Sequence, residues 1–407
     1  MTTATSASRA APMRAAAAPD RNLAVNYLRA FVTLLVVAHH SVLAYMPEAP
    51  PSGRFDQPPF LWAAFPIVDR PGWEGFSAFA GFNDTFFMAL MFLLSGLFVP
   101  ASLARRGAGG YARERLLRLG IPFLIGALLL APLAYYPSYA AQATHGSAGD
   151  YLRTWFALPH WTSGPVWFIA VLLLFGLLAA GLQAMKPGWQ DGVARLAAGS
   201  DRKPARFFAG LLLISALGYG VLNAVFGPVA WLQFGPFAVQ SSRILHYLIY
   251  FGAGIAIGAA GLESGLLSPA GALARRWWAW IILAVLAFVA AAATAIAGAI
   301  SGGQPAMLWA IIGPIAFALS CAASSFMLLA IFRRFVKRRR STLDSLAANA
   351  YAIYLLHYGF VVWLQFAFLG APVGSFAKGV LVFVLAVALS WASAALLRRL
   401  SVMARIL

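Results

Sequence analysis

The sequence predicts an all-α integral membrane protein, a bundle of about ten transmembrane helices with both termini in the cytoplasm. Three observations predict this class. Of the 407 residues, 61% are hydrophobic and only 10% are charged, whereas a soluble domain carries about 25% charged residues. The hydrophobic residues form runs of about 20, the length that a helix needs to cross the hydrocarbon core. The basic residues cluster between these runs, as they do where positive charge orients membrane helices.

Each run can be assigned to a span, and the chain outside the runs to tails and loops. The predicted spans lie near residues 23–46, 78–100, 116–136, 165–185, 207–226, 243–261, 277–298, 306–332, 349–369 and 376–397. Residues 1–22 lack a long apolar stretch, so we expect a disordered cytoplasmic tail rather than a cleaved signal peptide. The membrane domain then covers residues 23–400, and residues 401–407 form a second cytoplasmic tail.

The charged loops test this topology independently. With the N-terminus inside, 24 of the 30 basic residues fall on the cytoplasmic side and five on the outer side, and Arg29 lies within the first span. An odd number of spans would destroy this separation. The net charge of +18 therefore indicates contact with the lipid bilayer and not with nucleic acid. The single cysteine, Cys321, excludes an internal disulfide and a cysteine-clustered metal site, and we expect no bound metal or cofactor.

Two outer loops are rich in proline and aromatic residues, at 47–77 and 137–164. Such loops can fold over the mouth of the bundle as a lid or as a platform for a sugar ring. They can equally form a belt of tryptophans at the membrane surface. The sequence leaves both interpretations open.

The first span carries the principal candidates for chemistry, Arg29 and His40. Eleven residues is close to three helical turns, so the two side chains point to nearly the same face about 16 Å apart along the axis. Ionisable groups inside a membrane helix usually face a bundle interior or a wet cavity. Histidine can move a proton, and arginine can hold an oxyanion with a directional fork. His39 is rotated by about 100° from His40, and we expect it to have a packing role.

Further polar residues lie near the ends of other spans. Asp84 can orient a histidine or balance an arginine, or it can be an acid at a helix N-terminus. Arg115 and Arg118 lie on one helical side at the cytoplasmic mouth. They can bind the phosphates of a nucleotide-like donor such as coenzyme A, or contact lipid headgroups.

The remaining candidates belong to the fourth, sixth and ninth spans. Trp167, Arg243 and His246 lie where two spans begin on the outer side, and are candidates for binding an acceptor or for anchoring the helix at the interface. Tyr354 and His357 lie one turn apart within the ninth span. A histidine beside a tyrosine hydroxyl in an apolar helix predicts a second polar site facing the bundle interior.

This ordered set of motifs resembles the acyltransferase-3 family of bacterial membrane O-acyltransferases, over residues of about 22–400. The hallmark of that family, an arginine and a histidine separated by ten residues in the first helix, is met by Arg29 and His40. The likeness continues through Phe92-Leu-Leu-Ser-Gly96, Arg115-Leu-Leu-Arg-Leu-Gly-Ile-Pro122, Val166-Trp-Phe168 and Ile353-Tyr-Leu-Leu-His357. The combination of Arg118-Leu-Gly-Ile-Pro122 with Tyr354-Leu-Leu-His357 is similar to the branch that succinylates osmoregulated periplasmic glucans. In two places the chain departs from the family pattern, with Pro165 where a histidine is common and Met91-Phe92 in place of a double phenylalanine.

The resemblance implies a multi-pass enzyme of the bacterial inner membrane. We expect it to move an acetyl or succinyl group from cytoplasmic acyl-CoA, as a co-substrate, to a hydroxyl of a cell-envelope or periplasmic carbohydrate. His40, Arg29 and His357 are the expected catalytic residues, with Tyr354, Asp84, Trp167, Arg243 and His246 binding substrate and with Arg115 and Arg118 binding the donor. Two alternatives remain: a lipid or small-molecule acceptor, or a proton-coupled transporter.

Overall fold

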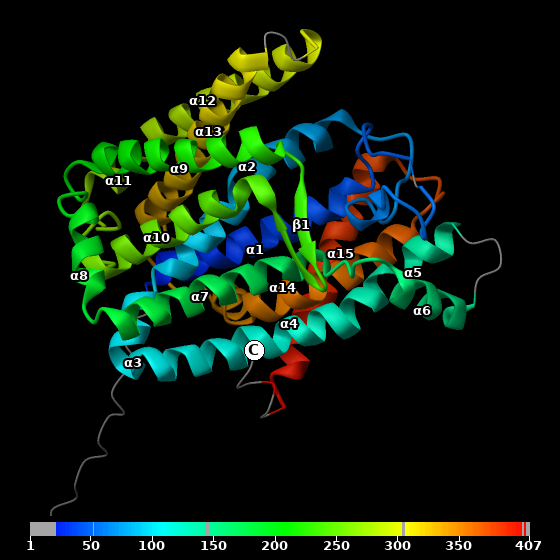
Figure 1. The fold of residues 1–407 in the computed structure, drawn as a ribbon, viewed down its shortest axis with the longest axis horizontal. Coiled ribbons are helices and arrows are strands. Elements are labelled where there is room, and N and C mark those ends of the chain that lie inside the picture. The colour runs from blue at the N-terminus through cyan, green and yellow to red at the C-terminus, as the bar shows by residue number, and fades with distance from the viewer. Residues whose placement is uncertain (1–21, 52, 143–146, 303–305, 401–402, 404–407) are drawn as a thin grey trace, which may run out of the picture.

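The computed structural model describes residues 22–51, 53–142, 147–302, 306–400 and 403 (Figure 1). The expected tails, residues 1–21 of the first and nearly all of 401–407, lie outside this part of the chain. The elements in chain order are α1 (Leu23–Leu43), η1 (Leu61–Ala63), α2 (Glu74–Gly96), α3 (Val99–Arg115), η2 (Leu116–Gly120), α4 (Ile121–Ile125), η3 (Gly126–Leu130), α5 (Ala131–Gln142), α6 (Ala148–Ala157), η4 (Gly164–Val166), α7 (Trp167–Met185), α8 (Trp189–Ala194), η5 (Arg195–Ala197), α9 (Pro204–Phe226), β1 (Trp231–Phe234), β2 (Phe237–Gln240), η6 (Ser241–Arg243), α10 (Ile244–Ala260), α11 (Ala272–Arg275), α12 (Trp277–Ile300), α13 (Ala306–Phe335), α14 (Ser341–Ala367) and α15 (Ser375–Leu397).

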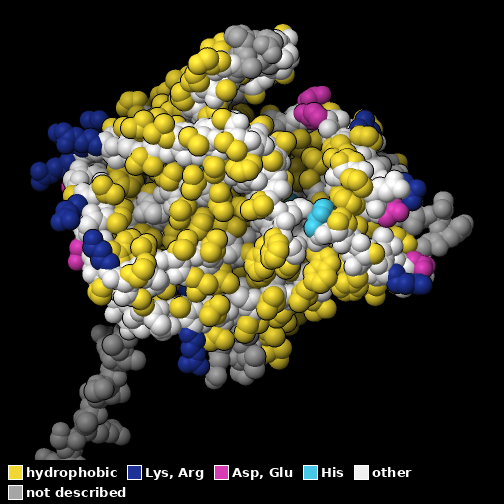
Figure 2. All heavy atoms as spheres, in the orientation of Figure 1, with side chains coloured by type: hydrophobic (Ala, Val, Ile, Leu, Met, Phe, Trp, Pro, Cys, Tyr) yellow, Lys and Arg dark blue, Asp and Glu magenta, His cyan; other side chains and the backbone are white. Residues whose placement is uncertain are grey.

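The prediction of an all-α bundle with ten spans is confirmed. Within the described residues, ten helical stretches are long and apolar enough to cross a membrane. Strands β1 and β2 form a single antiparallel hairpin. Figure 2 shows a broad hydrophobic surface between the two ends of the bundle, with Lys and Arg side chains gathered at the left-hand end, beside α8 and α11. We call this the basic end; the orientation of the bundle in the membrane stays a prediction.

Helices α1 and α14 run parallel from the basic end, although they are more than 300 residues apart in the sequence. Near their beginnings the Tyr27 hydroxyl donates to Asp344 Oδ1 at 2.8 Å and accepts from the backbone N–H of Arg340 at 2.9 Å. Near their other ends, the Gln365 amide donates to the backbone carbonyl of His40 at 2.8 Å. Because both helices rise about 1.5 Å per residue, residues equally far beyond Tyr27 and Asp344 reach the same depth.

The third span is interrupted by prolines, and side chains of α14 donate hydrogen bonds to the backbone carbonyls that these prolines leave unpaired. A proline in a helix has no N–H to donate and displaces the carbonyl four residues earlier. Pro122 thereby frees the carbonyl of Arg118, which accepts from the Tyr351 hydroxyl at 2.7 Å. Four residues before Pro137, the carbonyl of Leu133 accepts from Trp363 Nε1 at 2.9 Å. Two otherwise unpaired carbonyls therefore join the third span to α14, as the bilayer requires of every backbone group.

Two stretches of this span, η2 and η3, widen to π-helical turns. Each lies just before a proline, Pro122 or Pro132, that the helix must accommodate. Such turns are rare and often accompany functional sites.

Helices α2 and α10 approach closely through glycines. A Cβ atom on Gly254 would lie 2.1 Å from the carbonyl oxygen of Leu93, and one on Gly96 would lie 2.2 Å from that of Phe251. Only glycine fits at both positions, so these two residues allow the close approach of α2 and α10. Small residues are the usual means of bringing membrane helices together.

The outer loops fold over the end of the bundle opposite the basic end. Trp62 is fully buried, stacks on Phe55 at 4.2 Å between ring centroids, and packs against Tyr135 and Trp155. Of the two open interpretations, the structure favours a packed cover for this part of the loop. Burial raises the pKa of the Tyr151 hydroxyl, which stays neutral and donates to the carbonyl of Pro132.

A buried ion pair fastens this cover to the last span. Lys378 Nζ lies 2.6 Å from Asp69 Oδ2, with side chains that are only 6% and 7% exposed. The backbone N–H of Asp69 donates to the carbonyl of Ala44. The segment after α1 is thus joined to both α1 and α15.

The structure corrects several expected boundaries. Helix α2 begins at Glu74 and not near residue 78, so Asp84 lies ten residues inside the helix and the N-terminal interpretation of that acid is wrong. Helix α14 begins at Ser341, eight residues before the expected 349. Half of that extra length is polar, and the hydrogen bond of Asp344 to Tyr27 holds it against α1.

Candidate active site

His40 of α1 and His357 of α14 meet within the bundle. His357 Nε2 lies 3.3 Å from His40 Nδ1, and the ring centroids are 5.2 Å apart. His40 is 13 residues beyond Tyr27, and His357 is 13 residues beyond Asp344, so the parallel helices bring them to the same depth. Two histidines that were predicted from separate spans therefore form one site.

Neighbouring carbonyl groups assign the proton on each ring. His357 Nδ1 lies 2.5 Å from the carbonyl oxygen of Tyr354, and His40 Nδ1 lies 2.9 Å from that of Val36. A carbonyl oxygen can only accept, so both Nδ1 atoms carry hydrogen. In the neutral pair, His357 Nε2 then accepts part of the hydrogen bond from His40 Nδ1–H. His40 Nε2 holds the lone pair that can act as a base.

Three residues that were not predicted as site residues, Tyr358, Tyr135 and Gln365, are linked to this pair directly or through one another. The Tyr358 ring lies edge-on to His40, with centroids 5.2 Å apart. The Tyr358 hydroxyl donates to the Tyr135 hydroxyl at 3.1 Å. The Tyr135 hydroxyl donates in turn to the backbone carbonyl of Ala63 at 2.8 Å. Gln365 holds the carbonyl of His40. Tyr358 follows His357 directly, which is a signal in the sequence; Tyr135 and Gln365 gave none.

Tyr354, expected to support His357, does so mainly through its backbone. Its carbonyl accepts from the histidine, whereas its hydroxyl donates to the carbonyl of Pro165 at the beginning of the fourth span. The tyrosine therefore fixes α14 against η4, and its hydroxyl is engaged away from His40.

His39 faces a different helix from His40. Its ring packs on Phe87 of α2 with centroids 5.0 Å apart, and it stands at 84° to the His40 ring. This agrees with the 100° rotation expected between neighbours in a helix. The packing role predicted for His39 has this contact as its structural basis.

Asp84 and Arg243 form a second polar group. Arg243 donates through Nη2 to Asp84 Oδ2 at 2.6 Å and through Nη1 to Oδ1 at 2.9 Å, a bidentate pair. The guanidinium also lies 4.8 Å from the centre of the Phe317 ring. The arginine side chain is 10% exposed and that of the aspartate 48%, so the carboxylate keeps an accessible side. The expectation that Asp84 balances an arginine agrees with this geometry.

Two other candidates lie apart from the histidine pair. His246 is fully buried, with Nε2 3.3 Å from Cys321 Sγ and its ring against Tyr250. Trp167 stacks on Tyr247 with centroids 5.7 Å apart. Both side chains contact protein on the faces described, and neither contacts His40 or His357 in the interactions found.

The comparison with protein families decides between the interpretations of this site. The family described as "Acyltransferase domain", which is the acyltransferase-3 family, matches residues 22–395. The chain belongs to this family. It is thus an acyltransferase, and its ten spans make it a multi-pass membrane O-acyltransferase. No curated protein and no solved structure matches the chain.

The arginines expected to bind the donor lie on the third span of the acyltransferase, away from the histidines. Glu114 lies 2.9 Å from Arg106 and 3.7 Å from Arg118, and Arg115 lies over the Tyr111 ring at 4.8 Å. Tyr351, which binds the Arg118 carbonyl, precedes His357 by six residues, about 9 Å along α14. Arg29, an expected catalytic residue, is eleven residues from His40 and about 16 Å from it along α1.

Among the residues that the structure describes, no group of three or more histidine, cysteine or acidic side chains could hold a metal ion.

Proposed function

We propose that this acyltransferase moves an acetyl or succinyl group from cytoplasmic acyl-CoA to a hydroxyl of a cell-envelope carbohydrate. The observation that carries the proposal is the contact of His40 with His357, with both Nδ1 protons directed by backbone carbonyls. This arrangement leaves His40 Nε2 as the base. It also gives the imidazolium that forms a hydrogen-bond acceptor at His357 Nε2.

The steps balance with these groups alone. His40 Nε2 takes the proton of the acceptor hydroxyl as its oxygen attacks the thioester carbonyl carbon. The carbon–sulfur bond then breaks, and His40 returns the proton to the sulfur of coenzyme A. General acid–base catalysis of this kind contributes about 10²- to 10⁴-fold to a rate.

The donor is proposed to enter from the basic end. Arg115 and Arg118 bind its phosphates, and the acyl arm covers the distance of about 9 Å from the level of Arg118 to His357. Arg29 lies about 16 Å from His40 along the axis of α1, towards the basic end, and would hold the donor or its acyl oxygen. In this proposal the protein lies in a bacterial inner membrane, with the basic end facing the cytoplasm.

The acceptor is proposed to reach the pair from the other end. Asp84 and Arg243, with the accessible carboxylate, and Trp167 and His246 belong to this side of the proposal as binding or shaping residues. The similarity to the glucan-succinylating branch supports succinyl as the acyl group and a glucan as the acceptor.

A direct assay tests the proposal. Purified protein in nanodiscs receives radiolabelled succinyl-CoA or acetyl-CoA and envelope glycans from a deletion strain, and mass spectrometry locates the label on the glycan. We expect labelled ester with wild-type protein and a loss of at least 100-fold with His40→Ala at equal protein level. Ester formation at the normal rate in His40→Ala, or no transfer by the wild-type protein to any glycan hydroxyl, would refute it.

A further inference from the structure

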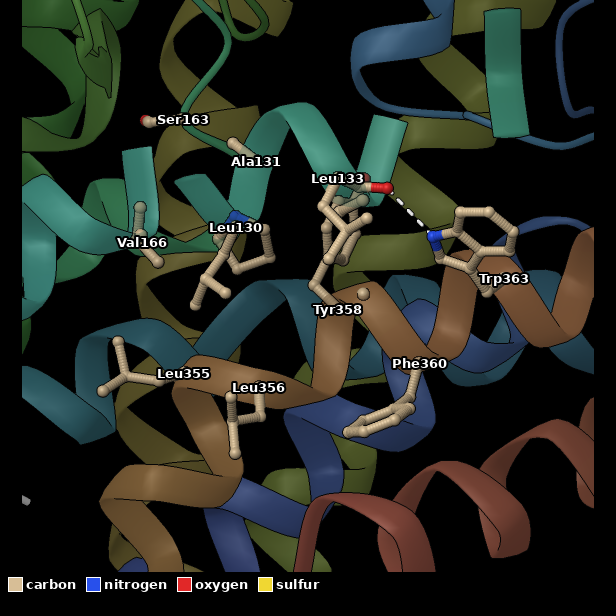
Figure 3. Close-up of a pocket in the computed structure, with 14 residues that line it drawn as sticks. Leu130, Ala131, Leu133, Ser163, Val166, Leu355, Leu356, Tyr358, Phe360 and Trp363 are labelled. Atoms are coloured by element: carbon tan, nitrogen blue, oxygen red, sulfur yellow. Dashed lines mark hydrogen bonds between the residues drawn. The ribbon is translucent and has the colours of Figure 1, made fainter. Parts of the chain in front are cut away.

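An apolar groove lies between the third span and α14, and Tyr358, which packs against His40, is one of its lining residues. Its volume is about 340 Å³, within the range of about 300–1,000 Å³ that small-molecule sites occupy. Figure 3 shows the groove with Leu130, Ala131 and Leu133 above it and Leu355, Leu356 and Phe360 below. The proposed reaction uses none of these residues.

The groove has a definite structural origin. The third span and α14 are joined at the Arg118–Tyr351 and Leu133–Trp363 hydrogen bonds, which are 12 residues apart on α14. The wide turn of η3 and the glycine at position 359 lie between these two connections. The helices cannot close there as they do at the connections, so a space remains.

The position of the groove indicates what enters it. Two of the lining residues, Leu133 and Trp363, are 58% and 40% exposed, on a face that meets the hydrocarbon of the bilayer. Tyr358 lines the groove and also packs edge-on against His40, so this residue connects the wall of the groove to the base. A molecule with its chain in the groove would hold its polar head beside the histidines.

We propose that the groove binds the hydrocarbon chain of a lipid-linked acceptor, whose hydroxyl-bearing head lies at His40. This inference rests on the proposed function and names the class of its acceptor. The groove favours the acceptor because it opens sideways into the membrane, where a lipid diffuses. Coenzyme A, in contrast, is water-soluble and is proposed to enter at the basic end.

Gly359 allows a precise perturbation. A Cβ atom on it would meet no heavy atom of the described residues within 4 Å, so Gly359→Leu fits its helix and occupies the groove. Gly181→Leu is the matched control, because Gly181 is also helical, is exposed on α7, and has no neighbour within 4 Å.

The first measurement compares methyl β-glucoside with dodecyl β-glucoside as acceptors in phosphatidylcholine nanodiscs, with labelled acetyl-CoA. We expect the ratio of kcat/KM for the dodecyl to the methyl acceptor to fall at least tenfold in Gly359→Leu and to stay unchanged in Gly181→Leu. Partition into the bilayer is the same for all three proteins. An unchanged ratio in Gly359→Leu overturns the inference. The inference is also overturned if Gly359→Leu lowers kcat/KM only when decanoyl-CoA is the donor, because the groove would then hold the acyl chain of the donor.

The second measurement does not need activity. A dodecyl glucoside that carries a diazirine in its chain should label peptides 126–134 and 355–363 in wild type, with labelling reduced at least tenfold in Gly359→Leu. Equal labelling by diazirine phosphatidylcholine would show ordinary bilayer contact and overturn the inference. If labelling is specific but neither glucoside is acylated, the groove stands as a lipid site and the proposed function fails. If methyl glucoside is acylated through His40 but the groove shows no specific labelling, the proposed function stands and the lipid site in the groove is refuted.

Discussion

Replacing His357 with alanine tests whether the two histidines act as one unit. The structure gives the imidazolium of His40 one side-chain acceptor, His357 Nε2, at 3.3 Å. A hydrogen bond to a charged group contributes about 1.5–3 kcal/mol, and about 1.36 kcal/mol corresponds to a factor of ten in rate. His357→Ala should therefore lower kcat by about 10- to 150-fold, whereas the KM for acyl-CoA should hardly change.

Two further variants separate this positioning role from a structural one. Glutamine places an amide oxygen near the position of Nε2, so His357→Gln should recover to within about tenfold of the wild-type kcat. The double variant His40→Ala/His357→Ala should be no slower than His40→Ala, because His357 acts through His40.

The assay is initial-rate transfer from labelled acyl-CoA in nanodiscs, with protein amount measured by absorbance and monodispersity by gel filtration. His39→Phe is the matched control in the same helix, since His39 packs against Phe87. Additive losses in the double variant, or the same loss in His357→Gln as in His357→Ala, would refute the reasoning. Either result would mean that His357 acts independently of His40.

Three other predictions concern how the scaffold holds the site. Lys378→Met leaves the Asp69 carboxylate buried without its cation. The free energy of unfolding should fall by about 3–5 kcal/mol, measured as a lower Tm in detergent. Exchanging the two residues, Lys378→Asp with Asp69→Lys, should restore part of the lost stability. Gly254→Val places a Cβ against the Leu93 carbonyl and should cost about 1–3 kcal/mol or more, whereas an equal Tm would contradict the close approach. Trp363→Phe removes one of the hydrogen bonds from α14 to the third span. We expect a loss of about 0.5–1.5 kcal/mol in unfolding free energy, with a changed dodecyl-to-methyl acceptor ratio in the transfer assay.

The class of fold could be predicted because the bilayer imposes it on composition. Only helices or closed barrels satisfy the backbone in hydrocarbon, so runs of about 20 apolar residues gave ten spans, and the structure has ten in the described chain. Hydropathy could not give the ends of the helices. Helix α14 begins in a polar stretch at Ser341, where tertiary contact with Tyr27 and not apolar character decides the conformation.

The site could be predicted in its members but not in its assembly. The cost of burying ionisable groups singled out His40 and His357 separately. Periodicity tells which residues share a face of one helix, and says nothing about which helices are neighbours. The pairings of Asp84 with Arg243 and of His40 with His357 therefore came only from the structure. For the same reason Gln365, which binds the backbone of another helix, gave no signal.

The position of His357 follows from contacts that lie outside the site. Tyr27 and Asp344 fix the relative depth of α1 and α14 at their beginnings, and the same separation of 317 residues recurs at His40 and His357. A one-residue change in the length of either 13-residue interval would rotate one histidine by about 100° and move it by about 1.5 Å. The prolines of the third span fix the position of the opposite side of α14, because the backbone carbonyls they free accept hydrogen bonds from Tyr351 and Trp363. The same two connections leave the groove open between them. The geometry of the base and the space beside it thus have one origin, the docking of α14 between α1 and an interrupted helix.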